Sequence, residues 1–236
     1  MILTLIFISN QSFMSSKPVS DTIYKEKKIP KNDIKFNFTL TDEQKLVKAS
    51  VYDKDVTFVL GTWGTGKTAV ACQIALDLLF KKHNGIDKIY VSRPIDFTAT
   101  GYLKGSLADK MDMHIMPIKQ NLYSAYNKEK IDTLFNDGVI QIIPISYMKG
   151  MNQLHSVTII DEFEDVTYHD FKIILTRLCK GSKLMFTGSE EQIDIKDSCV
   201  PRIKKLEGSG LVGYHTLTTN HRNEDIVKIL DYIEGK

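Results

Sequence analysis

The sequence predicts one α/β domain built around a mainly parallel sheet. Apolar runs of strand length alternate with helical patterns along much of its 236 residues. A glycine-rich segment lies where one apolar run, 56–60, passes into an amphipathic stretch, 69–80. A second run, 157–160, has the continuous Val/Ile character of a strand buried on both faces, and two acidic residues follow it. Together these features predict a ligand crevice at the carboxyl edge of the sheet.

The glycine-rich segment has the spacing of a phosphate-binding loop: glycine, four residues, glycine, lysine and threonine. Its glycines let successive backbone N–H groups turn toward a polyphosphate, at the positive end of the helix that follows. The lysine would reach the β- and γ-phosphates, and the threonine hydroxyl would bind Mg²⁺. The alternative is a turn that binds nothing, and the flanking pattern favours the phosphate loop. The predicted nucleotide-binding residues are Gly61, Thr62, Trp63, Gly64, Thr65, Gly66, Lys67 and Thr68.

Length, charge and cysteine content limit the number of domains, the partners and the cellular compartment that can be expected. A chain of 236 residues suits one domain with a short appendage. The net charge of +2 neither requires nor excludes a nucleic-acid partner. Three cysteines without paired spacing favour a reducing, cytoplasmic compartment, and the six histidines have no metal-ligand spacing. The apolar run 2–8 is too short to span a bilayer, so no membrane association is expected.

Residues 1–37 are expected to form a flexible arm, and residues 38–236 the nucleotide-binding domain. The arm is polar and lysine-rich and has no sustained hydrophobic period. The domain opens with a helix, because Thr41 and Gln44 have the spacing of a capping box. Gln44 also lies just upstream of the phosphate loop, so a second role stays open for its amide, which is pairing with an adenine edge.

Hydrophobic patterning predicts the remaining elements in order. The strand that follows the loop helix is closed by Pro94, and the segment 97–110 is expected to be a loop. Further strands are predicted at 88–92, 139–145, 183–187 and 212–217, and further helices at 111–126, 128–136, 168–178 and 224–233.

Two carboxylates, Asp161 and Glu162, come directly after the buried strand at 157–160. Since the carboxyl ends of parallel strands border the ligand crevice, both acids are expected beside the phosphate loop. Asp161 would hold Mg²⁺, mostly through water, and Glu162 would orient or deprotonate the attacking water. Two acids after a strand are more often a helix cap, but the phosphate loop upstream favours the catalytic role.

Four further polar residues have both a site role and an ordinary structural role open. Gln192 would contact the γ-phosphate or the attacking water, or lie in a polar turn. Arg93 would face phosphate or a polymer, or form a surface ion pair. Arg222 would act as an arginine finger, in cis or on a neighbouring subunit, or lie on the surface, and Arg177 would be structural or face a phosphate. Paired acids with a downstream glutamine favour activation of water over transfer to an alcohol, so hydrolysis is preferred to a kinase reaction.

The ordered motifs together resemble the PhoH-like family of phosphate-starvation-associated P-loop ATPases, which are similar to the core of superfamily 1 helicases. The resemblance runs from about Thr41 to Ile233. Besides the phosphate loop and the paired acids, it depends on Ser92-Arg93-Pro94, Gly101–Leu107 with Lys110-Met111, Tyr147–Gly150, Thr176–Leu178 with Gly181–Lys183, and Thr187-Gly188 with Gln192–Asp194.

This resemblance implies a three-layer, RecA-like P-loop NTPase fold, with ATP as the nucleotide and Mg²⁺ as its metal. It implies hydrolysis through the paired acids, and it strengthens the site roles of Gln192 and of the three arginines. The predicted catalytic residues are Lys67, Glu162, Gln192 and Arg222, and the predicted metal ligands are Thr68 and Asp161.

The resemblance also bears on partners. Family members are linked with RNA, and helicase-type rings suggest oligomers. We therefore expect RNA or single-stranded nucleic acid as a partner and a homo-oligomer, for which a hexameric ring is one arrangement. The alternative is a nucleotide-dependent switch or assembly module with little turnover, which acts through a protein partner.

Four positions depart from the family pattern. Ser189 stands where an Asp is common, and Glu164 and Asp165 stand where Gln and Asn are usual. The two acids add negative charge near the expected Mg²⁺ and γ-phosphate. Trp63 replaces a typically small residue of the loop. These departures leave nucleotide binding expected and predict an altered turnover.

Overall fold

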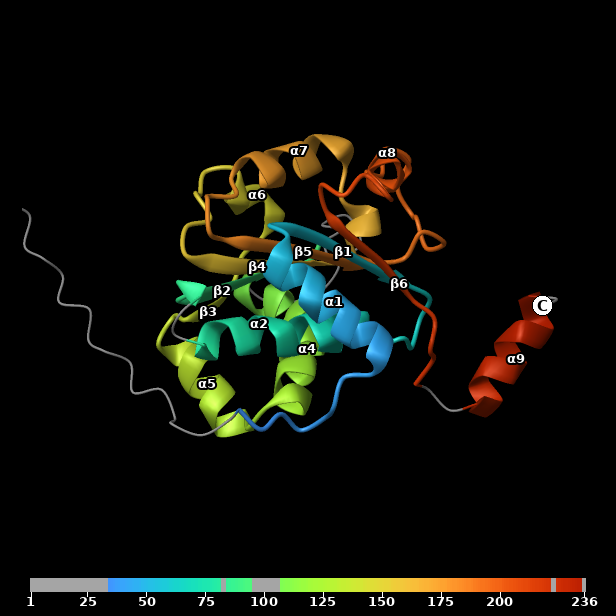
Figure 1. Cartoon of the computed structure of the whole chain (residues 1–236), viewed down its shortest axis with the longest axis horizontal. Helices are drawn as coiled ribbons and strands as arrows, with labels where there is room; N and C mark the ends of the chain where they lie inside the picture. Colours follow the sequence, from blue (N-terminus) through green and yellow to red (C-terminus); the bar gives the residue numbers. More distant parts are fainter. Residues whose placement is uncertain (1–33, 82–83, 95–106, 222–223, 235–236) are drawn as a thin grey trace, which may run out of the picture.

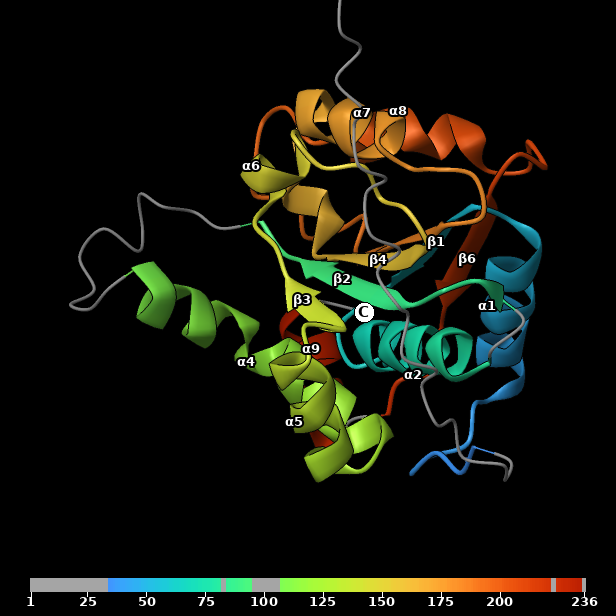
Figure 2. The ribbon, with the colours of Figure 1, turned by 90° about the vertical axis from the view of Figure 1, so that its left-hand side faces the viewer.

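The computed structural model describes residues 34–81, 84–94, 107–221 and 224–234. Within these ranges six strands form one sheet in the order β3-β2-β4-β5-β1-β6, and all neighbouring strands are parallel. Helices cover both faces (Figures 1 and 2), which confirms the predicted three-layer α/β architecture. The strands are β1 (Val56–Gly61), β2 (Lys88–Ser92), β3 (Ile140–Ile142), β4 (Ser156–Asp161), β5 (Lys183–Gly188) and β6 (Gly213–Leu217).

The helices divide between the two faces of the sheet (Figure 1). One layer contains α1 (Asp42–Asp53), α2 (Lys67–Phe80), α4 (Leu107–Ala125) and α5 (Lys128–Asn136). The other contains α6 (Ile145–Met148), α7 (Tyr168–Thr176) and α8 (Val200–Ile203), with the 3-10 turns η2 (Phe163–Asp165) and η3 (Lys204–Leu206). No helix in the described ranges is both long enough and apolar enough to cross a bilayer.

Residues of the central strands alternate between two apolar cores, one on each face. In β1, Phe58 belongs to one core and Val59 to the other. The core under α2 is mainly aliphatic, and α2 is buried at every position from Val70 to Leu79. The opposite core is aromatic, and the rings of Phe58 and Phe186 stack there with centroids 5.0 Å apart. Burial on both faces explains why these strands are continuously apolar in the sequence.

The main differences from the predicted elements are two boundaries and one segment for which no element was predicted. Helix α4 begins at Leu107, so its first residues lie in the segment predicted as a loop. The strand predicted at 139–145 ends at Ile142, because Pro144 caps the short helix α6. Helix α8 and turn η3 follow in a segment for which the sequence predicted no element. Their apolar residues Val200 and Ile203 are buried in the aromatic core.

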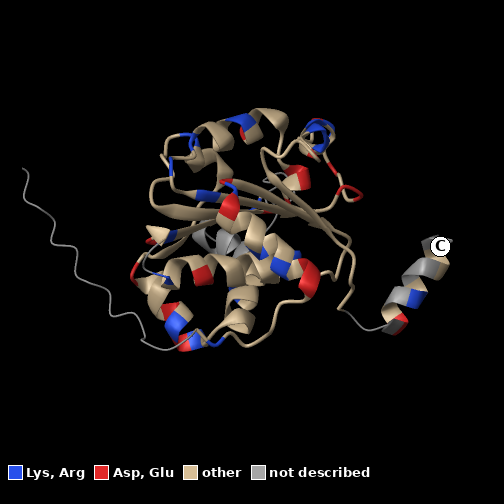
Figure 3. Cartoon of the chain, viewed as in Figure 1, with Lys and Arg blue, Asp and Glu red and all other residues tan. Residues whose placement is uncertain are grey.

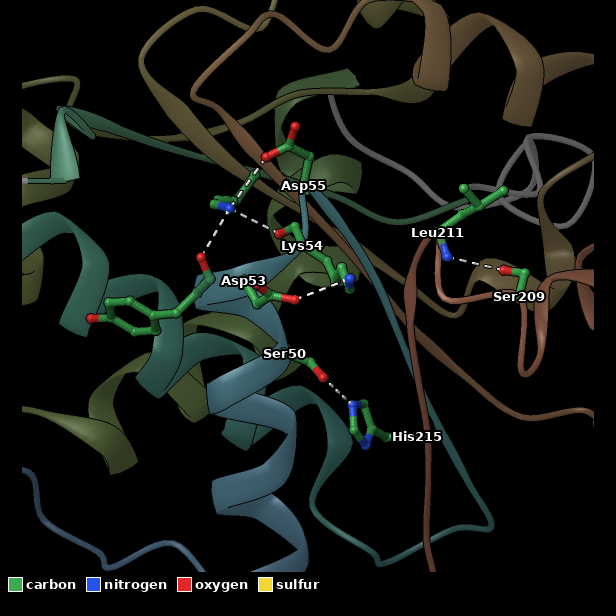
Figure 4. Close-up of polar contacts among 9 residues, drawn as sticks. Ser50, Asp53, Lys54, Asp55, Ser209, Leu211 and His215 are labelled. Carbon is green, nitrogen blue, oxygen red and sulfur yellow. Dashed lines mark hydrogen bonds and ion pairs between the residues drawn. The ribbon is translucent and has the colours of Figure 1, made fainter.

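A small polar network fixes α1 to the sheet (Figure 4). Lys183 Nζ donates hydrogen bonds to the carbonyls of Tyr52 and Lys54, at 3.3 and 2.9 Å. These carbonyls lie in the last turn of α1 and at its C-cap, where no further helical N–H is available to them. His215 of β6 lies 2.6 Å from the Ser50 hydroxyl, and burial lowers the pKa of this histidine. Strand β5 and edge strand β6 are thus both tied to α1.

The two ends of the described chain differ. Phe36 packs edge-on against Tyr126, and the Asn37 N–H donates to the Ala125 carbonyl at 3.0 Å. The last residues of the expected arm therefore lie on the domain, while residues 1–33 lie outside the described ranges. Helix α9 (Glu224–Glu234) stands apart from the layers (Figure 1). Its exposed apolar residues are Ile226, Ile229, Tyr232 and Ile233.

The aromatic core predicts a large effect on stability for Phe58→Ala. The Phe58 side chain is fully buried and contacts four other aromatic rings. Its truncation should lower the free energy of unfolding by about 3–5 kcal/mol, because it removes apolar contacts and leaves a cavity. Urea denaturation measures this loss. Leu211→Ala, at a side chain that is 75% exposed, is the control and should cost less than about 0.5 kcal/mol. Equal losses for the two variants would contradict the placement of Phe58.

Candidate nucleotide-binding site

A cavity of about 470 Å³ lies at the carboxyl edge of the sheet. It is bordered by the loop between β1 and α2, by the residues that follow β2, β4 and β5, and by one face of α4. This is the edge where open parallel sheets bind their ligands. Nine of the residues for which the sequence predicted a site role line it: Trp63, Gly64, Gly66, Lys67, Thr68, Arg93, Asp161, Glu162 and Gln192.

The phosphate loop has a backbone that few residues other than glycine adopt. Gly64 and Gly66 have φ angles of 79° and 80°, and Gly66 is the N-cap of α2. Lys67 Nζ lies within the loop and donates to the carbonyls of Gly61 and Thr62, both at 2.8 Å. The loop thus directs the N-terminus of a buried fourteen-residue helix and one ammonium group at the cavity.

The two predicted metal ligands, Thr68 of α2 and Asp161 of β4, contact each other. Asp161 Oδ1 accepts hydrogen bonds from Thr68 Oγ1 at 2.7 Å and from Thr187 Oγ1 at 2.6 Å. Thr187 is the register partner of Asp161 in β5, so the strand pairing itself orients this carboxylate. Hydroxyl and carboxylate oxygens are the hard ligands that Mg²⁺ prefers, and the donor set therefore fits that ion.

Glu162 has an unusual backbone and a charged partner. Its φ of 51° and ψ of 48° are left-handed, a conformation that costs a non-glycine residue on the order of 1 kcal/mol. Arg93 donates to both of its carboxylate oxygens, with Nε 2.6 Å from Oε2 and Nη2 bonded to Oε1. Of the two roles open for Arg93, the structure shows an ion pair, and this pair lies within the cavity.

Glu164 is a site residue that the sequence flagged only as a departure. Its side chain is buried, and Oε2 has no hydrogen-bond partner. Gly188 lies so close to it that a side chain at position 188 would overlap the Glu164 carboxyl group. Burial raises the pKa of Glu164 to about 7, opposed by hydrogen bonds from its own N–H and that of Ser189, and helped by the charges of Glu162 and Asp165.

Other predicted residues lie outside the cavity lining or outside the described chain. Thr65 is fully buried and donates to the Thr62 carbonyl, so it shapes the loop from within. Gln44 forms the predicted capping box with Thr41, and its Nε2 lies 3.4 Å from His221 Nε2. Its adenine role stays a prediction. Arg222 lies outside the described residues.

Arg177 is the C-cap of α7, where its N–H donates to Ile174 and its carbonyl accepts from Gln153. These are backbone contacts, and the Arg177 side chain is exposed, so both roles of its guanidinium stay predictions. It does not line the cavity described above.

The cavity residues that the sequence did not predict include one that follows β6 and two on α4. His221 lies beside the loop, and its N–H donates to the Gly64 carbonyl at 3.0 Å. Its place after β6 was a usable signal, since the other strand ends also carry site residues. Pro117 and Asn121 reach the cavity from α4. No local pattern marks these two, because only the packing of α4 against α2 brings them there.

A second, smaller cavity adjoins the first at Arg93. It has a volume of about 260 Å³ and lies beyond the ends of β2 and β3, against α6 and α7. Lys149 borders it and pairs with Asp170 at 2.9 Å. Arg93 thus stands on the wall that the two cavities share.

The parallel sheet, the glycine-rich loop after β1 and the acidic residue after β4 define a nucleotide-binding protein of the P-loop NTPase class. The model of the PhoH-like protein family matches residues 38–231, so the chain belongs to that family. PhoH-like proteins from Synechocystis and Bacillus subtilis are 35% and 30% identical to it, over 65% and 74% of the chain. These alignments cover 46% and 60% of the two relatives, so the chain spans about half their length.

A solved structure supports the same fold. The large terminase of a thermophilic bacteriophage is similar over 82% of this chain and 50% of the terminase, with a TM-score of 0.52 and 14% sequence identity. At this identity the similarity concerns the fold alone. It confirms the expected P-loop NTPase architecture.

The buried acid predicts a pH-dependent stability. Because the folded protein retains the Glu164 proton up to about pH 7, and the unfolded chain loses it near 4.5, ionisation disfavours folding. Relative to Glu164→Gln, the free energy of unfolding of the wild type should therefore fall by about 3 kcal/mol between pH 4.5 and 7. Above pH 7 it should level off. Urea denaturation of both proteins across this range tests the difference. A difference that does not change with pH would contradict the burial of the Glu164 carboxyl group.

Proposed function

We propose that the protein binds ATP together with Mg²⁺ and hydrolyses the γ-phosphate. The observation that carries this proposal is the meeting of two strand ends at one cavity. Lys67 and Thr68 begin α2, directly after the loop that follows β1. Asp161 ends β4 and Glu162 follows it, and Thr68 Oγ1 lies 2.7 Å from Asp161 Oδ1. A phosphate loop beside paired acids is the arrangement that water-activating NTPases require.

Each group has a chemical task in this proposal. Loop N–H groups and the α2 N-terminus would bind the phosphates, and Lys67 would exchange the loop carbonyls for β- and γ-phosphate oxygens. Thr68 and Asp161 would hold Mg²⁺, which supplies positive charge to the phosphates when bound. Glu162 would accept a proton from water as the water oxygen bonds to phosphorus. The bond from the γ-phosphorus to the β,γ-bridging oxygen breaks, leaving ADP and phosphate.

Three predicted roles complete this proposal. Gln192 is exposed after β5 and lines the cavity, so it can orient the attacking water. Arg222 would stabilise transition-state charge, and Gln44 would contact the adenine edge.

Three free cysteines, Cys72, Cys179 and Cys199, accord with a reducing cytoplasm as the site of action.

RNA or single-stranded nucleic acid is the proposed polymer partner, and the smaller cavity is its proposed contact. This cavity adjoins the nucleotide cavity at the carboxyl edge and shares Arg93 with it. A polymer phosphate there would lie near the guanidinium that also holds Glu162. The proposal does not depend on a basic surface, since Lys and Arg are interspersed with Asp and Glu (Figure 3).

A nucleotide-dependent switch with little turnover is the second candidate. The observation that favours it is the engagement of both Glu162 oxygens by Arg93, which leaves the expected base charge-compensated. Glu164 and Asp165 add carboxyl groups close by, where the family pattern has amides. In this candidate the ATP state controls assembly with a protein partner.

The ATPase proposal predicts hydrolysis that depends on named residues. With Mg²⁺, the wild type should release phosphate from ATP, and single-stranded RNA should raise the rate. Lys67→Ala and Glu162→Gln should each lower it by about 100-fold or more, because they remove phosphate binding and the base. Phosphate release at steady state is the measurement. Tight ATP binding with negligible release, with or without RNA, would favour the switch instead.

We also propose that the chain forms a homo-oligomer, and the exposed stripe on α9 supports this. Ile229 and Tyr232 are 54% and 89% exposed on this amphipathic helix. The double variant Ile229→Ser/Tyr232→Ser should therefore reduce the assembly toward the 26.8 kDa monomer. Size-exclusion chromatography with light scattering measures the mass. A wild type that is monomeric at all concentrations, or a variant with the same oligomeric mass, would contradict this interface.

A further inference from the structure

The contact between Arg93 and Glu162 joins two groups that the proposed reaction needs apart. Arg93 follows β2 and Glu162 follows β4, and the two strands are neighbours in the sheet, with Ser92 in register with Ile160. The guanidinium donates through Nε and Nη2 to the two oxygens of one carboxylate. Both side chains line the nucleotide cavity. The partner of the expected base is therefore itself within the site.

We propose that Arg93 distinguishes nucleoside triphosphates from diphosphates by exchanging the Glu162 carboxylate for the γ-phosphate. This inference deepens the proposed ATPase function and depends on it. Arg93 is then a specificity-determining residue that contacts the nucleotide. Through the same exchange it also positions Glu162.

The positions of the cationic side chains in the cavity support a contact between Arg93 and the γ-phosphate. Among the described residues that line it, Lys67 and Arg93 are the two that carry a lysine or arginine charge. Lys67 lies inside the loop, at the carbonyls of Gly61 and Thr62, where the β- and γ-phosphates approach the helix. Arg93 lies on the other side, at the end of β2, beside the base. It is the cation placed to meet the terminal phosphate.

Charge and shape both favour the exchange. A guanidinium binds carboxylates and phosphates through the same planar fork of N–H donors, so one geometry serves both partners. The γ-phosphate carries more negative charge than a single carboxylate, and the Glu162 side chain is 43% exposed, which lets water solvate it after release. Arg93 is 20% exposed and is held more firmly. A diphosphate offers no terminal group at this position and leaves the pair intact.

The exchange has a consequence for the reaction. While both of its oxygens accept from Arg93, the Glu162 carboxylate is engaged and is not positioned to orient the attacking water. Once a γ-phosphate draws Arg93 away, the carboxylate regains its capacity beside the phosphorus atom that the water attacks. The base would thus become available only when its substrate is bound.

Binding of Mg²⁺-ADP and of the Mg²⁺ complex of a non-hydrolysable ATP analogue, AMP-PNP, tests the proposal by calorimetry on the full chain. Arg93→Ala should weaken AMP-PNP binding about tenfold or more and change ADP binding less than about twofold. Arg93→Lys should give an intermediate loss for AMP-PNP, because it keeps the charge and loses the fork. Arg202→Ala is the matched control, since Arg202 also pairs with a carboxylate, Asp197, but lines neither cavity. It should change neither affinity.

A thermodynamic cycle separates exchange from a merely structural role. Glu162→Gln should tighten AMP-PNP binding severalfold, because Arg93 then has no carboxylate to leave, and adding Arg93→Ala should remove this gain. Equal losses of ADP and AMP-PNP affinity in Arg93→Ala, or no loss in either, would overturn this inference. The proposed ATPase function would stay intact in that case, provided that nucleotide binding still depends on Lys67. A wild type that binds neither nucleotide, or binds them equally well after Lys67→Ala, would overturn both.

Discussion

The parallel pairing of β1, β5 and β4 is the constraint on which the site depends. Leu60 is in register with Gly188, and Asp161 with Thr187, so the loops that leave these strands emerge side by side. A slip of one residue would turn Asp161 to the opposite face and separate it from Thr68. The register is held by the two cores, because each strand buries alternate residues on both faces. Packing energy thus fixes the geometry of the polar edge.

Three carboxyl groups with different surroundings lie at that edge. Asp161 is oriented by two hydroxyl donors, Glu162 by a guanidinium, and Glu164 by burial against Gly188. The three carboxyl groups lie within four residues of one another, yet each has a different partner and therefore a different chemistry. The left-handed backbone at Glu162 makes this division feasible, because it turns the chain sharply at the end of β4. The strain is local and lies at the point where function requires it.

Much of the fold could be predicted from the sequence because its signals are local. The loop spacing, the apolar strands and the capping box of Thr41 and Gln44 each depend on neighbouring residues, and all three appear in the structure. The errors fall where tertiary packing decides, as with the early start of α4 at Leu107. The family resemblance supplied ATP, Mg²⁺ and RNA, which patterning alone cannot specify.

The site was predicted less completely than the fold. Residues that follow strands were found, because strand ends have a known relation to the ligand crevice. The partner of Glu162 was not, since Arg93 is 69 residues away and only the sheet order places β2 beside β4. Nor could the sequence show that Glu164 is buried, because its exposure depends on the approach of Gly188.

The central claim is that nucleotide binds at the carboxyl edge between β1 and β4, and Trp63 offers a direct test. It is the only tryptophan of the chain and lines the cavity, so its fluorescence reports on that cavity alone. Titration with ATP and Mg²⁺ should give a saturable change in its emission that is weakened by omitting Mg²⁺ and abolished in Lys67→Ala. No change at millimolar ATP in the folded wild type, or the same change in Lys67→Ala, would contradict this account.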